Sequence, residues 1–441
     1  MRPITASRAL TSLSLVSAMV AGIVGVSSRA QRARAAPVTA LVGCPSHAVS
    51  VQVFPCLPPT CDPHAAAPSA VAAPVLARRT PQGLTVRLRP IPITPSLTGL
   101  SLWRDVAAWA TPSWAPARAH VRQPSRIYLA SLTSFRPEVI AQSCTGFGDL
   151  RLAAGRLLWT EPVSLALDRP ATSRIWALDL QTGRRSLVNA DAFPVRNNYD
   201  SSSFSVDGNT LTWTRGTGTS RRTNEPVRAA IVDRRLPDGP ITTLVGPIVV
   251  NLDNSGPPHE QTISGPQRAG SILLWEPSRW NGQAPVGDLL MKNLTTGRGR
   301  VLVRDVVSRA VTNGRKVFWT VPFGRPGQPL VRYDLRTGTH ALLSTVSNGF
   351  ESLLPSPTIT GSVLTWRTVA LVPGRGAYGL IARDLRTGQQ YQLATGGDVG
   401  ISGTAFSGPG WGWANRVGWG EQTISSAGEL QSSYLAITTI P

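Results

Sequence analysis

The residue types that most often carry out chemistry in enzymes are few in this chain and stand apart from one another. The five histidines occur singly, without the His-Glu-x-x-His spacing of metal-dependent proteases. They are His47, His64, His120, His259 and His340. The sequence has no Gly-x-Ser-x-Gly turn for a serine nucleophile and no Gly-x-x-x-x-Gly-Lys phosphate loop. We therefore predict no catalytic, cofactor-binding or metal-binding residue, and no cofactor.

Carboxylates are sparse, with 24 Asp and Glu in 441 residues. Asp179, Asp334 and Asp384 each precede Leu-x-Thr-Gly. That pattern is typical of a turn in which the carboxylate accepts hydrogen bonds from nearby amides. The segment 253–256, Asp-Asn-Ser-Gly, could contribute oxygen ligands to a calcium site, but an ordinary turn is favoured. These carboxylates are predicted to be structural.

The positive charge is almost all arginine. The chain holds 44 Lys and Arg, its formal net charge is +20, and its only lysines are Lys292 and Lys316. The arginines are spread along the chain and form no run interleaved with aromatic residues, which argues against nucleic-acid binding. A solvated basic surface is the simplest interpretation. Attraction to anionic envelope polymers or lipid headgroups is the functional one.

Residues 1–35 have the three-part pattern of a secretory signal peptide. Arg2 and Arg8 precede an uncharged apolar stretch at 9–26, and small-x-small cleavage sites follow it. An uncleaved membrane anchor is the alternative, because a stretch of this length can just span a bilayer. We expect a secreted or cell-envelope protein that is not integral to the membrane once the signal is cleaved.

Residues 36–80 are rich in Ala and Pro and show no periodicity, so we expect an extended linker before a folded domain at 82–441. The four cysteines are Cys44, Cys56, Cys61 and Cys144. Export favours disulfides, in one of three connectivities, and Cys56 with Cys61 is the nearest local pair. Cys44 and Cys61 each have a His three residues later, but no packed frame surrounds this zinc-like spacing. We expect the linker cysteines to be dispensable for the stability of the domain.

The sequence contains a repeat, and the repeated strands must position any functional site of the domain. A Trp that ends a short apolar strand recurs every 44 to 62 residues. These residues are Trp109, Trp159, Trp213, Trp275, Trp319, Trp366 and Trp419. Regular spacing of this kind predicts core packing between repeats and not a ligand cage.

A second motif, Asp/Asn-Leu-x-Thr-Gly with alternating apolar residues on both sides, follows the Trp strand in four repeats. It begins at Asp179, Asn293, Asp334 and Asp384. The period of two and the Gly in the turn predict a β-hairpin. With one early strand and the Trp strand, each repeat has four strands. We therefore predict an all-β fold, a β-propeller of seven four-stranded blades, with six as the alternative.

The repeat resembles that of the TolB-like β-propeller family, in which a Ser-Pro-Asp-Gly turn and an apolar strand precede Asp-Leu-x-Thr-Gly. Ser205-Val206-Asp207-Gly208 and the four hairpins carry the resemblance, which covers the chain from about residue 97 onward. Relatives in that family usually have six blades. The resemblance implies a fold and is nearly silent on function. Quinone-dependent dehydrogenase propellers share the turn but place Trp after it, where this chain has Leu.

The ring must be closed by the N-terminal side, because only Thr439-Ile440-Pro441 follow the last predicted strand. Residues 84–89 alternate between apolar and polar side chains. We predict that they pair antiparallel with 433–438 as the outer strand of the last blade. Such pairing leaves no open sheet edge at the closure.

Taken together, these features favour an exported, non-catalytic propeller that acts as a binding or scaffold module at the cell envelope. Its partner would be a protein or an anionic envelope polymer, docked on the loops 191–204 and 214–226 and the insertion 276–288 with Trp280. The alternative is a propeller-fold hydrolase or lyase with a site in the central funnel. Three or more converging Asp, Glu or His side chains there would favour the enzyme.

Overall fold

The protein was analysed as a computed structural model. Besides Cys61 and Leu97, it describes residues 75–92, 99–112, 123–162, 173–192, 204–216, 227–250, 260–263, 266–280, 285–306, 310–320, 330–344, 351–353, 357–372, 375–397, 403–406, 412–424 and 430–441. The chain divides into residues 1–57 and 58–441. The predicted signal peptide, Cys44, Cys56 and the segment 253–256 lie outside the described residues.

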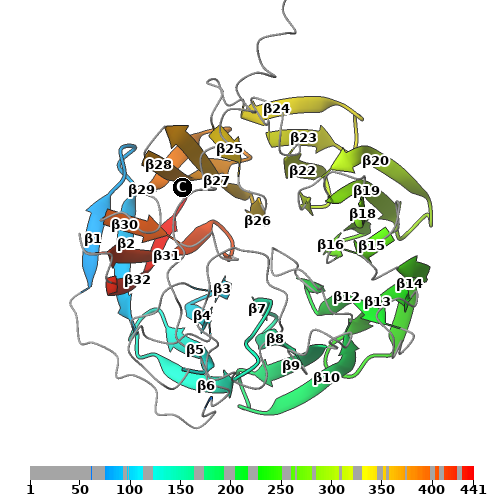
Figure 1. Ribbon diagram of the computed structural model, residues 1–441, viewed down its shortest axis with the longest axis horizontal. Coiled ribbons are helices and arrows are strands. Elements are labelled where there is room, and N and C mark those ends of the chain that lie inside the picture. The colour runs from blue at the N-terminus through cyan, green and yellow to red at the C-terminus, as the bar shows by residue number, and fades with distance from the viewer. Residues whose placement is uncertain are drawn as a thin grey trace, which may run out of the picture. The chain divides into compact units, whose positions relative to one another are not determined.

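The second unit forms a ring of seven four-stranded antiparallel blades (Figure 1), as predicted. From the centre outward, blade 1 consists of β3 (Gly99–Trp103), β4 (Val106–Thr111), β5 (Ser125–Ser131) and β6 (Glu138–Ser143). Blade 2 consists of β7 (Leu150–Ala153), β8 (Arg156–Pro162), β9 (Ser173–Asp179) and β10 (Arg185–Ala192). Blade 3 consists of β11 (Phe204–Asp207), β12 (Thr210–Gly216), β13 (Val227–Arg235) and β14 (Ile241–Val250).

The remaining blades follow the same order. Blade 4 consists of β16 (Gln267–Ala269), β17 (Ile272–Trp275), β19 (Pro285–Asn293) and β20 (Gly299–Val306). Blade 5 consists of β21 (Val311–Thr312), β22 (Lys316–Thr320), β23 (Leu330–Asp334) and β24 (His340–Ser344). Blade 6 consists of β26 (Thr358–Thr360), β27 (Val363–Val372), β28 (Arg375–Asp384) and β29 (Gln390–Gly397). Blade 7 consists of β30 (Gly403–Phe406), β31 (Arg416–Ile424), β32 (Leu430–Thr439) and β2 (Thr85–Ile91).

Short extra strands extend blades 4 and 6, and a further one on blade 7 is described below. β15 (Glu260–Ile263) and β18 (Pro277–Trp280) widen blade 4, and β25 (Glu351–Leu353) pairs with β27. The described residues contain no helix, so none of their segments is a candidate helix for crossing a membrane.

The core lies between blades. Each repeat Trp sits on the second strand of its blade, and all seven have exposed fractions of 9% or less. Trp419 is fully buried among Leu84, Val86 and Leu88 of the N-terminal strand. These contacts confirm that the Trp series is structural. Truncating a buried Trp of this kind to Ala typically costs about 3–5 kcal/mol.

The hairpin turns have the predicted chemistry. The Asp179 carboxylate accepts hydrogen bonds from the amides of Gln181, at 3.1 Å, and Thr182, at 3.0 Å. Gly183 in the same turn has φ +70°, a conformation that favours glycine. Asn293 accepts the equivalent pair of bonds from Thr295 and Thr296 in blade 4. An amide oxygen can therefore replace the carboxylate in this turn.

These bonds also set the acidity of the turn carboxylates. The backbone hydrogen bond from Thr182 lowers the pKa of Asp179, and that from Thr337 lowers the pKa of Asp334. Burial raises the pKa of Asp384, but hydrogen bonds from Arg386 and Thr387 outweigh burial and leave this pKa below its ordinary value. All three carboxylates therefore accept hydrogen bonds within their own turns.

The N-terminal strand closes the ring as predicted. β2 pairs antiparallel with β32, with Arg87 opposite Ile437 and Arg89 opposite Leu435. β2 is not the outermost strand, however, because β1 (Leu76–Arg79) pairs along its outer edge. Arg78 of β1 forms an ion pair with the buried Glu421 of β31 and so crosses the blade. Part of the segment predicted as linker therefore belongs to blade 7.

The disulfide prediction for Cys61 is wrong. Cys61 is bonded to Cys144, which follows β6 of blade 1, and 83 residues separate the two in sequence. Proximity in sequence favoured Cys56, but the fold brings the end of blade 1 to the N-terminal segment. Cys61 therefore fastens that segment to the propeller.

Candidate functional site

A pocket of about 620 Å³ lies at the point where the ring closes, between the last blade and the first. Its lining comes from both ends of the chain. The lining residues are Thr85, Arg87, Arg89, Asp105, Leu132, Thr133, Arg416, Ile437, Thr438 and Thr439. Pockets of 300 to 1,000 Å³ are typical of small-molecule sites, so this one can hold a ligand of that size.

The alternation of β2 places two arginines in the pocket. Leu84, Val86 and Leu88 are buried in the core that contains Trp419. Since successive side chains of a strand point to opposite faces, Arg87 and Arg89 lie together on the other face. The sequence pattern that closes the ring therefore also lines the pocket.

The third arginine is Arg416, the first residue of β31. Its Nη1 donates a hydrogen bond to the carbonyl oxygen of Arg104, in the turn between β3 and β4 of blade 1. That turn is held in an uncommon conformation, because Arg104 has φ +52° without being glycine. Arg416 thus joins the last blade to the first at the edge of the pocket.

Arg89 is held at the back of the pocket. Its Nη2 donates to the carbonyl oxygen of Leu132 at 3.0 Å, and its guanidinium lies 5.5 Å from the ring centre of Phe135. Burial and the neighbouring charge of Arg87 both lower the pKa of Arg89. Partial burial and the like charge of Arg87 thus disfavour the charged form of this guanidinium.

No carboxylate within the described residues forms an ion pair with Arg87, Arg89 or Arg416. Asp105 is the one acidic residue of the lining, and it too forms no ion pair with a described residue. Three guanidinium groups against one carboxylate give the pocket a net positive charge. Guanidinium groups bind carboxylate and phosphate oxygens, often through two hydrogen bonds at once, so the pocket suits an anionic group.

The residues considered from the sequence lie elsewhere. Among the described residues no group of three or more His, Cys, Asp and Glu could hold a metal ion. His340 packs against Trp319 and Tyr333 in blade 5, with ring centres 5.9 and 4.7 Å away. The other four histidines and most of the loops 191–204 and 214–226 lie outside the described residues, as does the side chain of Trp280.

The pocket was missed because no single segment carries it. The alternation of 84–89 was used to predict the closing strand, and its arginines were assigned to the polar face without a function. Two arginines on one face of a strand at a closure are a signal that could have been followed. Arg416 and Asp105 join them only through pairing of the chain ends, which the sequence does not place in three dimensions.

No protein-family model and no curated protein matches the chain. Solved structures do resemble it. An oligogalacturonate lyase in complex with manganese has a TM-score of 0.49 at 12% identity, over 83% of this chain and 96% of that one. A prolyl endopeptidase has a TM-score of 0.49 at 12% identity, over 78% of this chain and 50% of that one. The chain therefore spans about half the length of the prolyl endopeptidase.

TolB from Acinetobacter baumannii also resembles the chain, with a TM-score of 0.38 at 13% identity over 77% of this chain and 78% of that one. The resemblance to TolB-like propellers stated from the repeat is therefore confirmed at the level of fold. At these identities the resemblance shows the fold alone.

The predictions of a non-catalytic binding or scaffold module and of a chain that is not an enzyme are wrong. Propeller structures that resemble the chain come from prolyl endopeptidase, acylaminoacyl peptidase, puromycin hydrolase and oligogalacturonate lyase. The absence of a local catalytic motif does not by itself exclude an enzyme. A ring of blades can assemble a site from residues that are distant in sequence, as the pocket at the closure illustrates.

Proposed function

We propose that the chain is a propeller-fold hydrolase or lyase that acts on an anionic substrate, and that the pocket at the ring closure holds the anionic group. The single observation that carries this proposal is the convergence of Arg87, Arg89 and Arg416 on one pocket without a paired carboxylate. Arg89 and Arg416 are half-buried and Arg87 is exposed, and three like charges are costly to bring together unless an anion neutralises them.

Each arginine has a distinct part in this proposal. Arg89 is fixed by the Leu132 carbonyl and Phe135, so it offers its remaining N–H groups from a rigid position. Arg87 is exposed and unpaired among the described residues, so it can turn to the ligand. Arg416 belongs to β31, which lies on the other side of β32 from the strand of Arg87 and Arg89. A carboxylate or phosphate bound between them would be contacted from two sides, which fixes its orientation.

Asp105 is the group in the pocket that can move a proton. In a lyase reaction on a substrate with a carboxylate, a base removes the proton on the carbon next to that carboxylate, while cationic groups stabilise the negative charge that develops. A carbon–carbon double bond then forms as the C–O bond to the leaving sugar breaks, and the leaving oxygen takes up a proton. In a hydrolase a carboxylate activates water. We assign Asp105 the proton-transfer role in either case, and the arginines the binding and charge-stabilising role.

We further propose that the substrate comes from the cell envelope, where anionic polymers are abundant. The sequence-based expectation of export and the net charge of +20 support this location. A carboxylated polysaccharide such as polygalacturonate is a suitable first probe, because each of its sugar units offers a carboxylate to a guanidinium.

The test is a turnover assay of the full chain with polygalacturonate, with neutral dextran as the uncharged control. Elimination is followed by the ultraviolet absorbance of the new double bond, and hydrolysis by new reducing ends. Asp105→Asn should abolish turnover and leave binding of the polymer intact. Asp238→Asn is the matched control, because Asp238 is an exposed turn carboxylate paired at 3.6 Å with Arg234 in blade 3.

The proposal fails if an active preparation retains full turnover in the Asp105→Asn and Arg87→Gln variants. In that case the reaction takes place at another site. It fails equally if Asp238→Asn lowers turnover as much as Asp105→Asn, since a general effect on folding would then explain both.

A further inference from the structure

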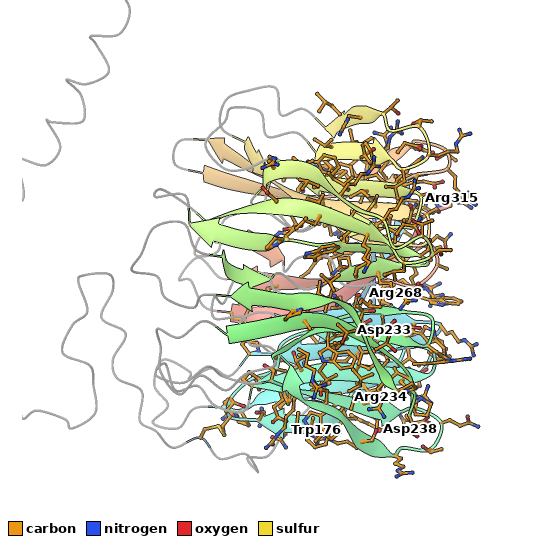
Figure 2. The ribbon with its side chains drawn as sticks, turned by 90° about the vertical axis from the view of Figure 1, so that its right-hand side faces the viewer. Trp176, Asp233, Arg234, Asp238, Arg268 and Arg315 are labelled. Atoms are coloured by element: carbon orange, nitrogen blue, oxygen red, sulfur yellow. A yellow bond between two sulfur atoms is a disulfide. The ribbon has the colours of Figure 1, made fainter. Side chains whose placement is uncertain are left out.

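We propose that the end of the propeller that carries the hairpin turns docks onto an anionic lipid bilayer, with Trp413 entering the interface between water and lipid. We call this end the turn face; it comprises the β-hairpin turns and the strand ends that they join. Figure 2 shows it on the right, with Arg315 on that side. The pocket at the ring closure lies on the same face, since Asp105 and Arg416 belong to its turns and strand ends, but the inference rests on the charge and exposed side chains of the whole face and not on the chemistry of the pocket.

Exposed arginines surround the turn face, and they come from all seven blades. They are Arg79, Arg104, Arg136, Arg184, Arg185, Arg235, Arg298, Arg300, Arg315, Arg336 and Arg386. The exposed acidic residues in the same described turns and strand ends are Asp105, Glu138 and Asp238. The surface is therefore strongly basic, and its charge is distributed around the ring.

Other acids of the turn face are bonded within the fold. Asp233 forms an ion pair with Arg268, and Figure 2 shows the two near each other between blades 3 and 4. Asp179 lies 3.4 Å from Arg156 and also accepts the amides of its own turn. Asp334 likewise accepts the amides of Arg336 and Thr337. Asp384 is bonded in the same way and also forms an ion pair with Arg386.

Exposed apolar side chains gather at the same end of the ring. Trp413 is 41% exposed in the turn between β30 and β31, next to Ala414 with φ +55°. Leu187, Ile241, Val301 and Leu342 are 40% to 60% exposed and belong to the outermost strands of blades 2 to 5. Each lies within the first three residues of its outermost strand, beside the turn.

The combination identifies the partner. A soluble polyanion would be attracted by the arginines but would gain nothing from an exposed Trp and a series of aliphatic side chains. A bilayer offers both anionic headgroups and an interface in which Trp is favoured. Each Arg or Lys close to an anionic lipid surface strengthens binding about fivefold. A broad face with many such arginines can therefore hold the propeller on a membrane without a spanning segment.

The test uses the full chain and sedimentation with vesicles. One preparation contains phosphatidylglycerol and phosphatidylcholine, and the control contains phosphatidylcholine alone. We expect binding to the anionic vesicles only, weakened by added salt because the headgroup attraction is screened. The triple variant replaces three arginines of the turn face by glutamine: Arg298→Gln, Arg315→Gln and Arg336→Gln. Its partition coefficient between vesicles and water should be lower by about two orders of magnitude.

Arg174→Gln is the matched control. Arg174 is exposed near the start of β9, at the opposite end of the blade from the turn. We expect this variant to bind the anionic vesicles like the unaltered chain. Trp413→Ala should weaken binding, whereas Trp413→Phe should preserve most of it, because Phe also favours the interface. Unchanged melting temperatures identify the variants that are correctly folded.

Three results would overturn the proposal. Equal binding to both kinds of vesicle would show that anionic lipid is not recognised. The loss of vesicle binding can be divided by the number of arginines replaced. If Arg174→Gln lost as much binding per arginine as the triple variant, net charge, and not the turn face, would be responsible. Binding to soluble dextran sulfate with no sedimentation of the protein with vesicles would identify a polymer as the partner.

Discussion

The disulfide between Cys61 and Cys144 should make a large contribution to the stability of the propeller. It closes a loop of 83 residues that contains β1, β2 and all of blade 1. The perturbation is the double variant Cys61→Ser with Cys144→Ser, which removes the bond without leaving a free thiol at either position. Removing this cross-link allows the unfolded chain many more conformations, so unfolding becomes more favourable.

The magnitude follows from the loop length. The chain-entropy relation gives about 4.5 kcal/mol at 25 °C for a loop of this length. The second unit spans residues 58–441, and an unfolding entropy of about 2.1 cal/mol/K per residue amounts to roughly 0.8 kcal/mol/K for the whole unit. The ratio of these two quantities predicts a fall in melting temperature of about 5 to 6 °C.

Differential scanning calorimetry of the oxidised chain and of the double variant measures this shift. The oxidised chain treated with a reductant is a second control, and it should melt with the double variant. A shift below about 1 °C would refute the reasoning, since the cross-link would then not restrict the unfolded chain. A disulfide between Cys56 and Cys61 in a peptide map would refute the structural basis itself.

Three other predictions follow from the fold. Deleting residues 75–91 removes β1 and β2, so blade 7 should lose its outer strands, and size-exclusion chromatography should show aggregates where the full chain elutes as a single species. Because the folded-state pKa of Asp334 is lowered, its contribution to stability is complete above the unfolded pKa of about 3.9 and is lost as the pH falls through the lowered value. Asp334→Asn, which copies Asn293, should therefore make acid unfolding less steep, as measured by circular dichroism between about pH 5 and 2; an unchanged acid profile would contradict this. Ala154 has φ +48°, so Ala154→Gly should stabilise the chain by about 1 kcal/mol in urea titration, and a loss of stability would contradict the strain assigned to this turn.

The blades could be predicted from the sequence because each is encoded locally. The Trp that ends a strand and the Asp-Leu-x-Thr-Gly turn repeat in order, and a period of two fixes which side chains enter the core. The closure by 84–89 could also be predicted, because the count of strands left one missing and only one unassigned segment alternated.

Features that depend on contacts between distant segments could not be predicted in this way. β1 lies in Pro- and Ala-rich sequence, and its pairing becomes apparent only once β2 is in place. Cys61 meets Cys144 because the closure brings the N-terminal segment to blade 1. The pocket depends on the same closure, since Arg87 and Arg416 come from opposite ends of the chain. A search for catalytic motifs that compares neighbours in sequence cannot find a site of this kind.

The most direct test of the proposed function is isothermal titration calorimetry with an oligogalacturonate. The titration compares the full chain with a double variant that carries Arg87→Gln and Arg416→Gln. Arg79→Gln is the matched control, because Arg79 is an exposed arginine on β1 that bonds the Gly83 carbonyl at 3.1 Å and does not line the pocket. Hydrogen bonds to charged groups contribute about 1.5–3 kcal/mol each, so the double variant should bind at least a hundredfold more weakly. The account predicts saturable binding by the full chain and by Arg79→Gln, and its near loss in the double variant. Equal affinity in all three proteins would contradict it.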